Sequence, residues 1–176
     1  MVKEIARAVE IPEGVAVSVE GNTVTVKGPK GQLTRQLSYP EIEIKKEDSQ
    51  LIVNSRLNRK QHRAMVGTLA AHVGNMIAGV TRGYEYKMKV VYSHFPIQLK
   101  AAPNELIINN FLGERKPRSA RILPGAKVEI GKDEVSITGI DKEQVGQTMA
   151  NIEQATKVRG FDIRIFQDGI YLVDKR

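Results

Sequence analysis

The feature that most constrains the fold of this 176-residue chain is an internal repeat. Residues 49–54 (SQLIVN) alternate between polar and apolar side chains, and the same pattern returns at 133–138 (DEVSIT). Strict alternation is typical of a half-buried strand. Because the elements around this strand return with it, the sequence predicts two copies of one structural unit rather than a single large domain.

Each copy of this strand is followed by a signal for the start of a helix. Asn58 with Gln61, and Asp141 with Gln144, have the spacing of a capping box, in which two side chains satisfy N–H groups of the first turn. Residues at steps of three or four then place one packing face on each helix. On the first helix they are Met65, Leu69, Val73, Met76, Ile77 and Val80, and on the second Val145, Met149, Ile152 and Thr156.

Short strands are expected around each helix, because alternating runs are separated by turns that contain Gly. The first half has such runs at 15–19, 23–27 and 32–37, and another after the helix at 85–92. The second half has them at 95–99, 106–110, 126–130, 162–166 and 170–173. The sequence therefore predicts an α+β fold of two tandem similar domains, 1–82 and 83–176. Each is expected to be a small antiparallel or mixed sheet with a helix packed on one face.

The charge of the chain indicates the class of its partner. Lys and Arg number 27 against 20 Asp and Glu, so the formal net charge is +7. A basic protein favours polyanions, with nucleic acid ahead of a membrane surface. Aromatic residues make up only 5%, which argues against a surface that stacks many unpaired bases and favours recognition of the phosphates and shape of folded RNA or of a duplex.

Patterns for catalysis are weak. The absence of Cys excludes thiolate nucleophiles, thiolate metal ligands and disulfides. His62, His72 and His94 do not have the spacing of a metal pair and are expected at the surface or near a helix cap. The Gly-Pro-Lys-Gly run at 28–31 is interpreted as a turn with Lys30 at its apex, since proline lacks the N–H that a phosphate loop needs. We therefore expect no enzyme, no metal site and no cofactor.

Three groups of cations are the candidate binding residues. The first lies on a loop at 113–121 and consists of predicted phosphate contacts, Arg115, Lys116, Arg118 and Arg121. The second is expected around the C-terminal sheet, with Arg164 on a strand: Lys157, Arg159, Arg164 and Lys175. The third occupies the first turns of the first helix, where the helix dipole disfavours cations and so suggests an RNA or protein partner: Arg59, Lys60 and Arg63, with Lys30 as a further contact.

Three segments carry a family resemblance that extends over nearly the whole chain. Residues 24–31 (VTVKGPKG), 110–118 (NFLGERKPR) and 166–171 (FQDGIY), together with the duplicated strand–helix unit, resemble large-subunit ribosomal protein six, the universal family six, in its archaeal and eukaryotic branch. The archaeal type fits best. In the bacterial branch a Lys-Gly-Lys-Gly stretch stands where this chain has residues 166–169, so Arg159 and Arg164 are expected to supply charge there.

The resemblance implies two similar α+β domains and a structural role in the large ribosomal subunit. It implies binding to 23S-type ribosomal RNA near the base of the stalk and the sarcin–ricin loop, chiefly through the second domain. The implied partners are large-subunit RNA and neighbouring ribosomal proteins, with no membrane and no small-molecule substrate. The implied location is the cytoplasm, within the large subunit. Two alternatives stay open, a free-standing regulatory RNA-binding protein that reads base edges and an enzyme or enzyme subunit.

Overall fold

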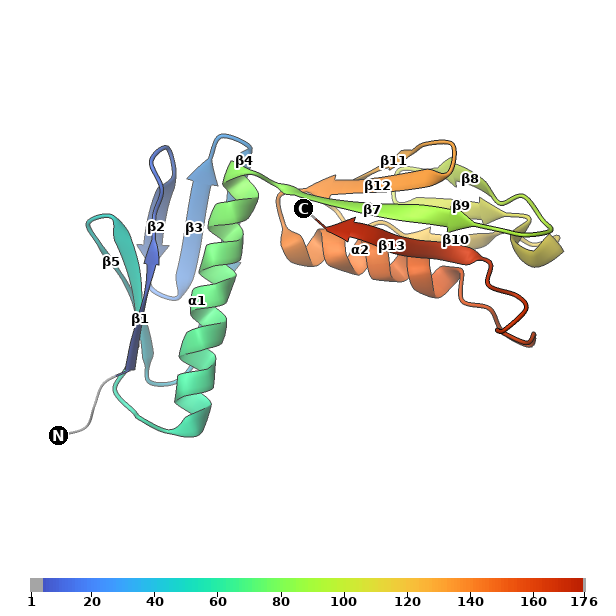
Figure 1. Cartoon of the computed structure of the whole chain (residues 1–176). Coiled ribbons are helices and arrows are strands. Elements are labelled where there is room, and N and C mark those ends of the chain that lie inside the picture. The colour runs from blue at the N-terminus through green and yellow to red at the C-terminus, as the bar shows by residue number, and fades with distance from the viewer. Residues whose placement is uncertain (1–4, 176) are drawn as a thin grey trace. The chain divides into compact units, whose positions relative to one another are not determined.

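The computed structural model describes residues 5–175, and the chain divides into two compact units. Unit 1 is Met1–Gly83 and unit 2 is Tyr84–Arg176 (Figure 1). The predicted α+β class with two tandem similar domains is confirmed. Each unit holds one long helix, and each has two small antiparallel sheets where the sequence predicted one.

Unit 1 packs the helix α1 (Lys60–Thr81) on two three-stranded sheets. One sheet has the order β1 (Ile5–Glu10), β6 (Gln50–Ser55), β5 (Ile42–Glu47), and the other β2 (Ala16–Glu20), β3 (Thr23–Gly28), β4 (Gly31–Gln36). Alternate residues of the central strands face the helix, so Val24, Val26, Leu51 and Val53 are buried. The repeated strand at 49–54 is thus the centre of its sheet.

The apolar face of α1 supplies the other half of this core. Val66, Leu69, Val73, Met76 and Val80 are buried, whereas Met65, predicted on the same face, is only half-buried. By length and composition α1 could cross a membrane, but its buried residues form the core of unit 1, which is the behaviour of a core helix in a globular domain.

His62 is also buried on this face, against the ring of Tyr39 with 5.6 Å between ring centroids. Of the two positions expected for His62, the surface is therefore wrong, whereas the region of a helix cap is correct, because His62 lies in the first turn of α1. Tyr39 follows β4, so the segment after that strand packs on the first turn of α1.

The two predicted helix caps differ in outcome. Asp141 is the N-cap of α2 (Lys142–Ala155) and accepts a hydrogen bond from the N–H of Glu143 at 2.9 Å, which confirms Asp141 as the cap. The predicted return bond from Gln144 is not among the hydrogen bonds of residues 5–175. In unit 1 the N-cap is Arg59 and no side chain caps it, so the predicted Asn58 cap is wrong. The amide oxygen of Asn58 instead accepts from Nη2 of Arg63 at 2.9 Å.

The Gly-Pro-Lys-Gly run forms the expected turn, between β3 and β4, and lies on the last turn of α1. The N–H of Lys30 donates to the carbonyl of Val80 at 2.9 Å, and its ammonium donates to the carbonyl of Arg82. A methyl group on Gly28 would lie 2.7 Å from Cγ2 of Val80, so only glycine permits this close approach. The turn therefore satisfies carbonyl groups that the end of α1 leaves open.

Unit 2 packs α2 on a three-stranded and a four-stranded sheet. The first has the order β10 (Arg118–Arg121), β9 (Glu105–Asn109), β8 (Gln98–Ala101), and a short 3-10 helix, η1 (Phe111–Gly113), follows β9. The second has the order β11 (Ala126–Ile130), β12 (Glu134–Gly139), β7 (Tyr84–Val91), β13 (Gly169–Lys175). Its core includes Met88, Ile108, Ile137, Ile152 and Ile170, all buried.

The strand predicted at 162–166 does not form. The carbonyl of Asp162 accepts from the N–H groups of Ile165 and Phe166, and its carboxylate accepts from the N–H of Arg164 at 3.0 Å. An Asp that binds the backbone N–H two residues on closes a turn in place of a strand ladder. The segment between α2 and β13 therefore projects as a loop, shown in red-orange beyond the end of α2 (Figure 1).

Candidate nucleic-acid interface

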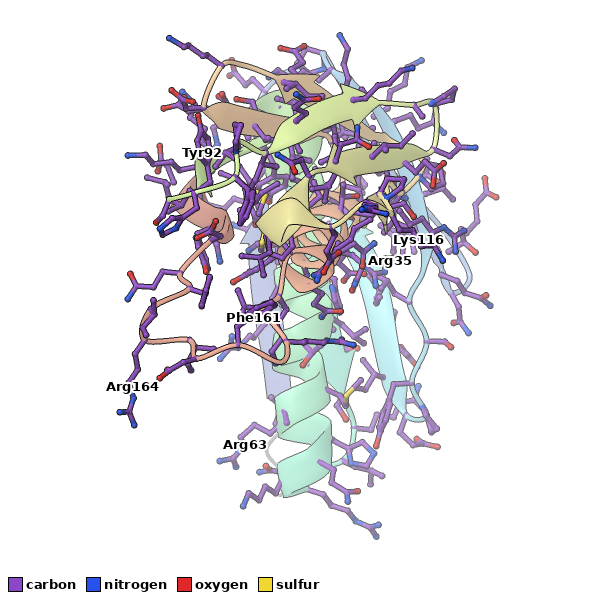
Figure 2. All side chains as sticks on the ribbon, turned by 90° about the vertical axis from the view of Figure 1, so that its right-hand side faces the viewer. Arg35, Arg63, Tyr92, Lys116, Phe161 and Arg164 are labelled. Atoms are coloured by element: carbon purple, nitrogen blue, oxygen red, sulfur yellow. The ribbon has the colours of Figure 1, made fainter. Side chains whose placement is uncertain are left out.

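The predicted loop of four cations is divided between a loop and a strand. Arg115 and Lys116 lie on the loop that joins η1 to β10, and both are exposed. Lys116 is labelled in Figure 2. Arg118 and Arg121 lie on β10 itself, and Arg121 is exposed opposite Glu105 of β9. The predicted loop therefore ends at Pro117, because backbone pairing of Arg118 with Ile108 begins the strand.

Arg118 is held entirely by groups of unit 2. Its Nε and Nη2 donate to the two carboxylate oxygens of Glu114 at 2.8 and 2.6 Å. Its Nη1 donates to the carbonyl oxygens of Ala155 and Lys157, both at 3.0 Å. The guanidinium carbon lies 4.3 Å from the ring centroid of Phe111. Planar, bidentate pairing and stacking are what a guanidinium provides and an ammonium does not.

This arrangement joins two of the predicted cation groups. Arg118 ties the base of the loop that carries Arg115 and Lys116 to the end of α2, where Lys157 begins the next loop. The hydrogen bond from Arg118 also holds the pKa of the Glu114 carboxyl below its ordinary value. Glu114 therefore stays ionised and compensates Arg118, which leaves Arg115 and Lys116 to set the charge of the loop.

The second predicted group is only partly brought together. Lys157 and Arg159 are exposed in the loop after α2. Arg164 projects into solvent from the turn of that loop, not from a strand (Figure 2). Lys175 lies at the other end of β13, with its ammonium 5.7 Å from the ring centroid of Tyr86. Since β13 has seven residues, its length of about 20 Å separates Lys175 from the others.

Six of the predicted cations of unit 2 are exposed and available to an outside partner. Within the part of the chain that the structure describes, no side-chain ion pair or hydrogen bond engages these six residues, which are Arg115, Lys116, Arg121, Lys157, Arg159 and Arg164. Among residues 5–175 there is also no cluster of three or more His, Asp or Glu that could hold a metal ion.

The cations of unit 1 are less uniform. Arg59 and Lys60 are exposed at the start of α1, whose first turn contains no acidic residue. Arg63 is exposed but bound to Asn58, and the ammonium of Lys30 is bound to the carbonyl of Arg82. Lys30 therefore has an internal role at the end of α1, whereas Arg59 and Lys60 leave an uncompensated positive charge at the helix start.

A cavity beside the end of α2 was not predicted. Its volume is about 470 Å³ and its walls include Phe166 and Tyr171. The ring centroid of Phe161 lies 4.9 Å from that of Phe166. Of the nine aromatic residues in the chain (5 Tyr and 4 Phe), these three fall within 161–171, and this local enrichment is the signal that an overall aromatic fraction conceals.

Asp168 lies in residues 166–169, the stretch that corresponds to Lys-Gly-Lys-Gly in the bacterial branch, and its side chain points inward. It is 1% exposed, and its carboxylate accepts from the N–H of Ser93 at 3.4 Å. Its backbone carbonyl accepts from the hydroxyl of Tyr171. The carboxyl group of Asp168 is therefore enclosed in unit 2 and does not face a partner.

Comparison with known proteins gives a consistent result over the whole chain. The family model described as Ribosomal protein L6 matches residues 11–83 and 95–169, once in each unit. A protein of Methanothrix thermoacetophila called "Large ribosomal subunit protein uL6" is 65% identical over 176 residues, which is 100% of both chains. Proteins of the same name from Methanospirillum hungatei and Methanosarcina mazei are 56% and 54% identical, over 97% and 99% of both chains.

Proposed function

Since the chain belongs to the ribosomal protein L6 family, we propose that it binds large-subunit ribosomal RNA through the exposed cations of unit 2. The proposed position is near the base of the stalk and the sarcin–ricin loop, as the resemblance of residues 24–31, 110–118 and 166–171 implies. The chain is a large-subunit ribosomal protein with a structural role and not an enzyme. A location in the cytoplasm follows from that of the ribosome.

The observation that carries this proposal is the pairing of charges around Arg118. Glu114 and the carbonyl groups at the end of α2 bind the guanidinium of Arg118. Arg115 and Lys116 on the loop before β10, and Lys157 on the loop after α2, remain exposed and unpaired. Arg118 holds these two loops next to each other. Their unpaired cations can therefore bind phosphate oxygens on one surface of a folded RNA. Arg159 and Arg164 extend this surface along the loop that follows α2.

The start of α1 is proposed as a second contact. Arg59 and Lys60 place two positive charges where the helix dipole is already positive, and such a placement is stabilised by an external anion. Large-subunit RNA or an acidic surface of a neighbouring ribosomal protein supplies that anion. Lys30 drops out of this contact because its ammonium is bound at the other end of α1.

The mechanism predicts a steep dependence on salt. Each phosphate neutralised on duplex-like RNA contributes about 0.9 to the slope of log affinity against log salt concentration. Contacts from Arg115, Lys116, Lys157, Arg159 and Arg164 would therefore give a slope of roughly −4 to −5. The measurement is binding of the full chain to large-subunit RNA between 50 and about 200 mM salt. A slope near zero would contradict the proposal.

A paired set of variants tests the residues. Arg115→Ala with Lys116→Ala should weaken binding and reduce the magnitude of the salt slope by about 2, since two phosphate contacts are lost. Lys46→Ala with Lys132→Ala removes the same charge from exposed positions outside the proposed surface and serves as the control. Equal affinity of both variants would remove the loop from the interface. Equal binding to a shuffled RNA would count against the alternative of a regulatory protein that reads sequence.

A further inference from the structure

We propose that the cavity between the end of α2 and the 158–168 loop holds one unpaired nucleobase of the bound RNA. This inference rests on the proposed RNA binding and adds a contact that the charges alone do not provide. The volume of about 470 Å³ falls within the range of roughly 300 to 1,000 Å³ that is typical of small-ligand sites. The walls come from Ala150, Glu153, Gln154, Thr156, Lys157, Val158, Ile163, Phe166, Gln167 and Tyr171.

The aromatic walls are held in place before any ligand arrives. The hydroxyl of Tyr171 donates toward the carbonyl oxygens of Gln167 and Asp168, at 3.2 and 3.4 Å. The ring of Phe166 packs on Phe161. Tyr171 nevertheless remains 41% exposed, so part of its surface is free for contact. An aromatic ring that is fixed yet accessible is the usual platform on which an unpaired base stacks.

The polar groups of the cavity match a base and not a phosphate. Glu153 has only acceptor oxygens when ionised and would repel a phosphate, but it can accept from ring and exocyclic N–H groups of a base. The amides of Gln154 and Gln167 offer both donors and acceptors. These three side chains can therefore meet the edge of a base whose faces contact Tyr171 and the aliphatic walls.

Cations stand at the border of the cavity, where the phosphates of an extruded nucleotide would lie. Lys157 is part of the wall, Arg159 follows two residues later, and Arg164 is adjacent to the wall residue Ile163. This separation, with an apolar and hydrogen-bonding interior and a positive border, is complementary to a nucleotide and its flanking phosphates. The wall residue Ile163 is 70% exposed in the chain alone and is therefore available for contact with such a base.

A volume of about 470 Å³ is large enough to take an unpaired base. The proposal thus agrees with the low aromatic content of the chain, because a single extruded base needs a single platform. Most of the affinity would still come from phosphate contacts. The base would contribute register, fixing which nucleotide of the RNA lies against α2.

Ultraviolet cross-linking tests the contact directly. Large subunits that contain the full chain are irradiated, the protein is digested with trypsin, and peptides that carry a nucleotide are identified. We expect a nucleotide on Phe166 or Tyr171, both in the peptide Ile165–Lys175. Cross-links confined to other peptides, or a cross-link from Tyr171 to another protein, would overturn the proposal.

A filled cavity gives an independent test with the full chain and large-subunit RNA. Ala150→Leu extends a side chain into the cavity without removing any hydrogen bond, and Ala64→Leu makes the same change on an exposed position of α1 as the control. We expect about ten-fold weaker binding for Ala150→Leu with an unchanged salt slope, because a stacking contact is lost and no phosphate contact is. Wild-type affinity for Ala150→Leu would overturn the proposal.

Aromatic variants separate stacking from cavity shape. Tyr171→Phe keeps the ring and should bind within about two-fold of wild type, whereas Tyr171→Leu should lose about ten-fold. Equal affinity of these two variants would contradict a stacked base. Ile163→Ala, at a residue 70% exposed, tests the same wall without disturbing the core. If the cavity proposal alone fails, these variants bind normally while Arg115→Ala with Lys116→Ala still binds weakly. If RNA binding itself fails, wild type shows no salt-dependent binding.

Discussion

Nη1 of Arg118 donates to the carbonyl oxygen of Ala155, the last residue of α2, at a distance of 3.0 Å. The same nitrogen reaches the carbonyl of Lys157, and the other side of the guanidinium binds Glu114. One half-buried side chain therefore satisfies carbonyl groups at the end of α2 and fixes the loop before β10. Arg118 is separated from Ala155 by 37 residues and from Lys157 by 39 residues.

Replacing Arg118 distinguishes an anchor from a phosphate contact. Arg118→Lys keeps the charge but loses the planar fork, so it should destabilise the protein by about 1–3 kcal/mol, the cost of disrupting hydrogen bonds to charged and partly buried groups. RNA affinity should fall with an unchanged salt slope, because no phosphate contact is lost. Denaturant unfolding and salt titration measure the two effects. Stability equal to wild type together with a shallower slope would show that Arg118 contacts phosphate.

The ion pair of Glu114 with Arg118 predicts an acid dependence of stability. The hydrogen bond from Arg118 lowers the pKa of Glu114 from an ordinary value of 4.5. A carboxyl whose folded pKa is lowered contributes stability above its unfolded pKa and loses it as pH falls through the folded value. We expect Glu114→Gln to be less stable than wild type at pH 7 and to approach it as the pH falls below 4.5 and through the lowered pKa of Glu114. A difference that stays constant from pH 7 to about pH 3 would contradict this linkage.

Alanine substitutions at Gly28 and Gly74 test how closely the backbone packs at each position. Gly28→Ala would place Cβ 2.7 Å from Cγ2 of Val80 and 2.9 Å from its carbonyl oxygen, so the turn must shift away from α1. Overpacking of this kind costs about 1–3 kcal/mol. Gly74→Ala lies within α1 with nothing within 4 Å and should stabilise unit 1 by about 0.5–1 kcal/mol. Thermal unfolding of both variants measures these opposite signs, and a shift in the same direction would refute the close-approach argument.

Thr156 joins the end of α2 to β13. Thr156 is 3% exposed. Its hydroxyl accepts from the N–H of Ile170 at 3.1 Å and donates to the carbonyl of Ile152. Thr156→Val keeps the shape but leaves a buried N–H without an acceptor, at a cost of about 1–3 kcal/mol. The amide of Ile170 should exchange with solvent hydrogen faster in this variant. Thr68→Val, at an exposed hydroxyl on α1, is the control and should leave stability nearly unchanged.

The central strands and both helices could be predicted from the sequence because their signals are local. Alternation at 23–27 and 133–138 reports burial of every second residue, and steps of three or four report the helix face. β1 and β5 were missed because only two large apolar residues on each pack against the core, Ile5 and Val9 or Ile42 and Ile44, so their alternating pattern is weak. β10 was missed because its run of cations was assigned to a loop. Alternation at 162–166 indicated a strand, but Asp162 captured the backbone N–H groups that a strand would need.

The candidate interface was less predictable, because it depends on contacts between distant segments. A count of cations in the sequence identified Arg115, Lys116 and Lys157. It could not reveal that the N–H groups of Arg118 donate hydrogen bonds to Glu114 and to carbonyl groups at the end of α2. Similarly, Lys30 lies in a prominent basic turn, yet its partner is a carbonyl 52 residues away. Which cations remain available to a partner is therefore a property of tertiary structure.

The turn that exposes Ile163 and Ile165 has a consequence for the protein before it is incorporated into a subunit. These side chains are 70% and 67% exposed, and they lie beside Phe161, which is 50% exposed. A chain outside the ribosomal subunit thus exposes an apolar patch on this loop, and exposed apolar patches promote self-association. We expect surplus copies to be the least soluble form of this polypeptide, so that its production must keep pace with the supply of new ribosomal particles.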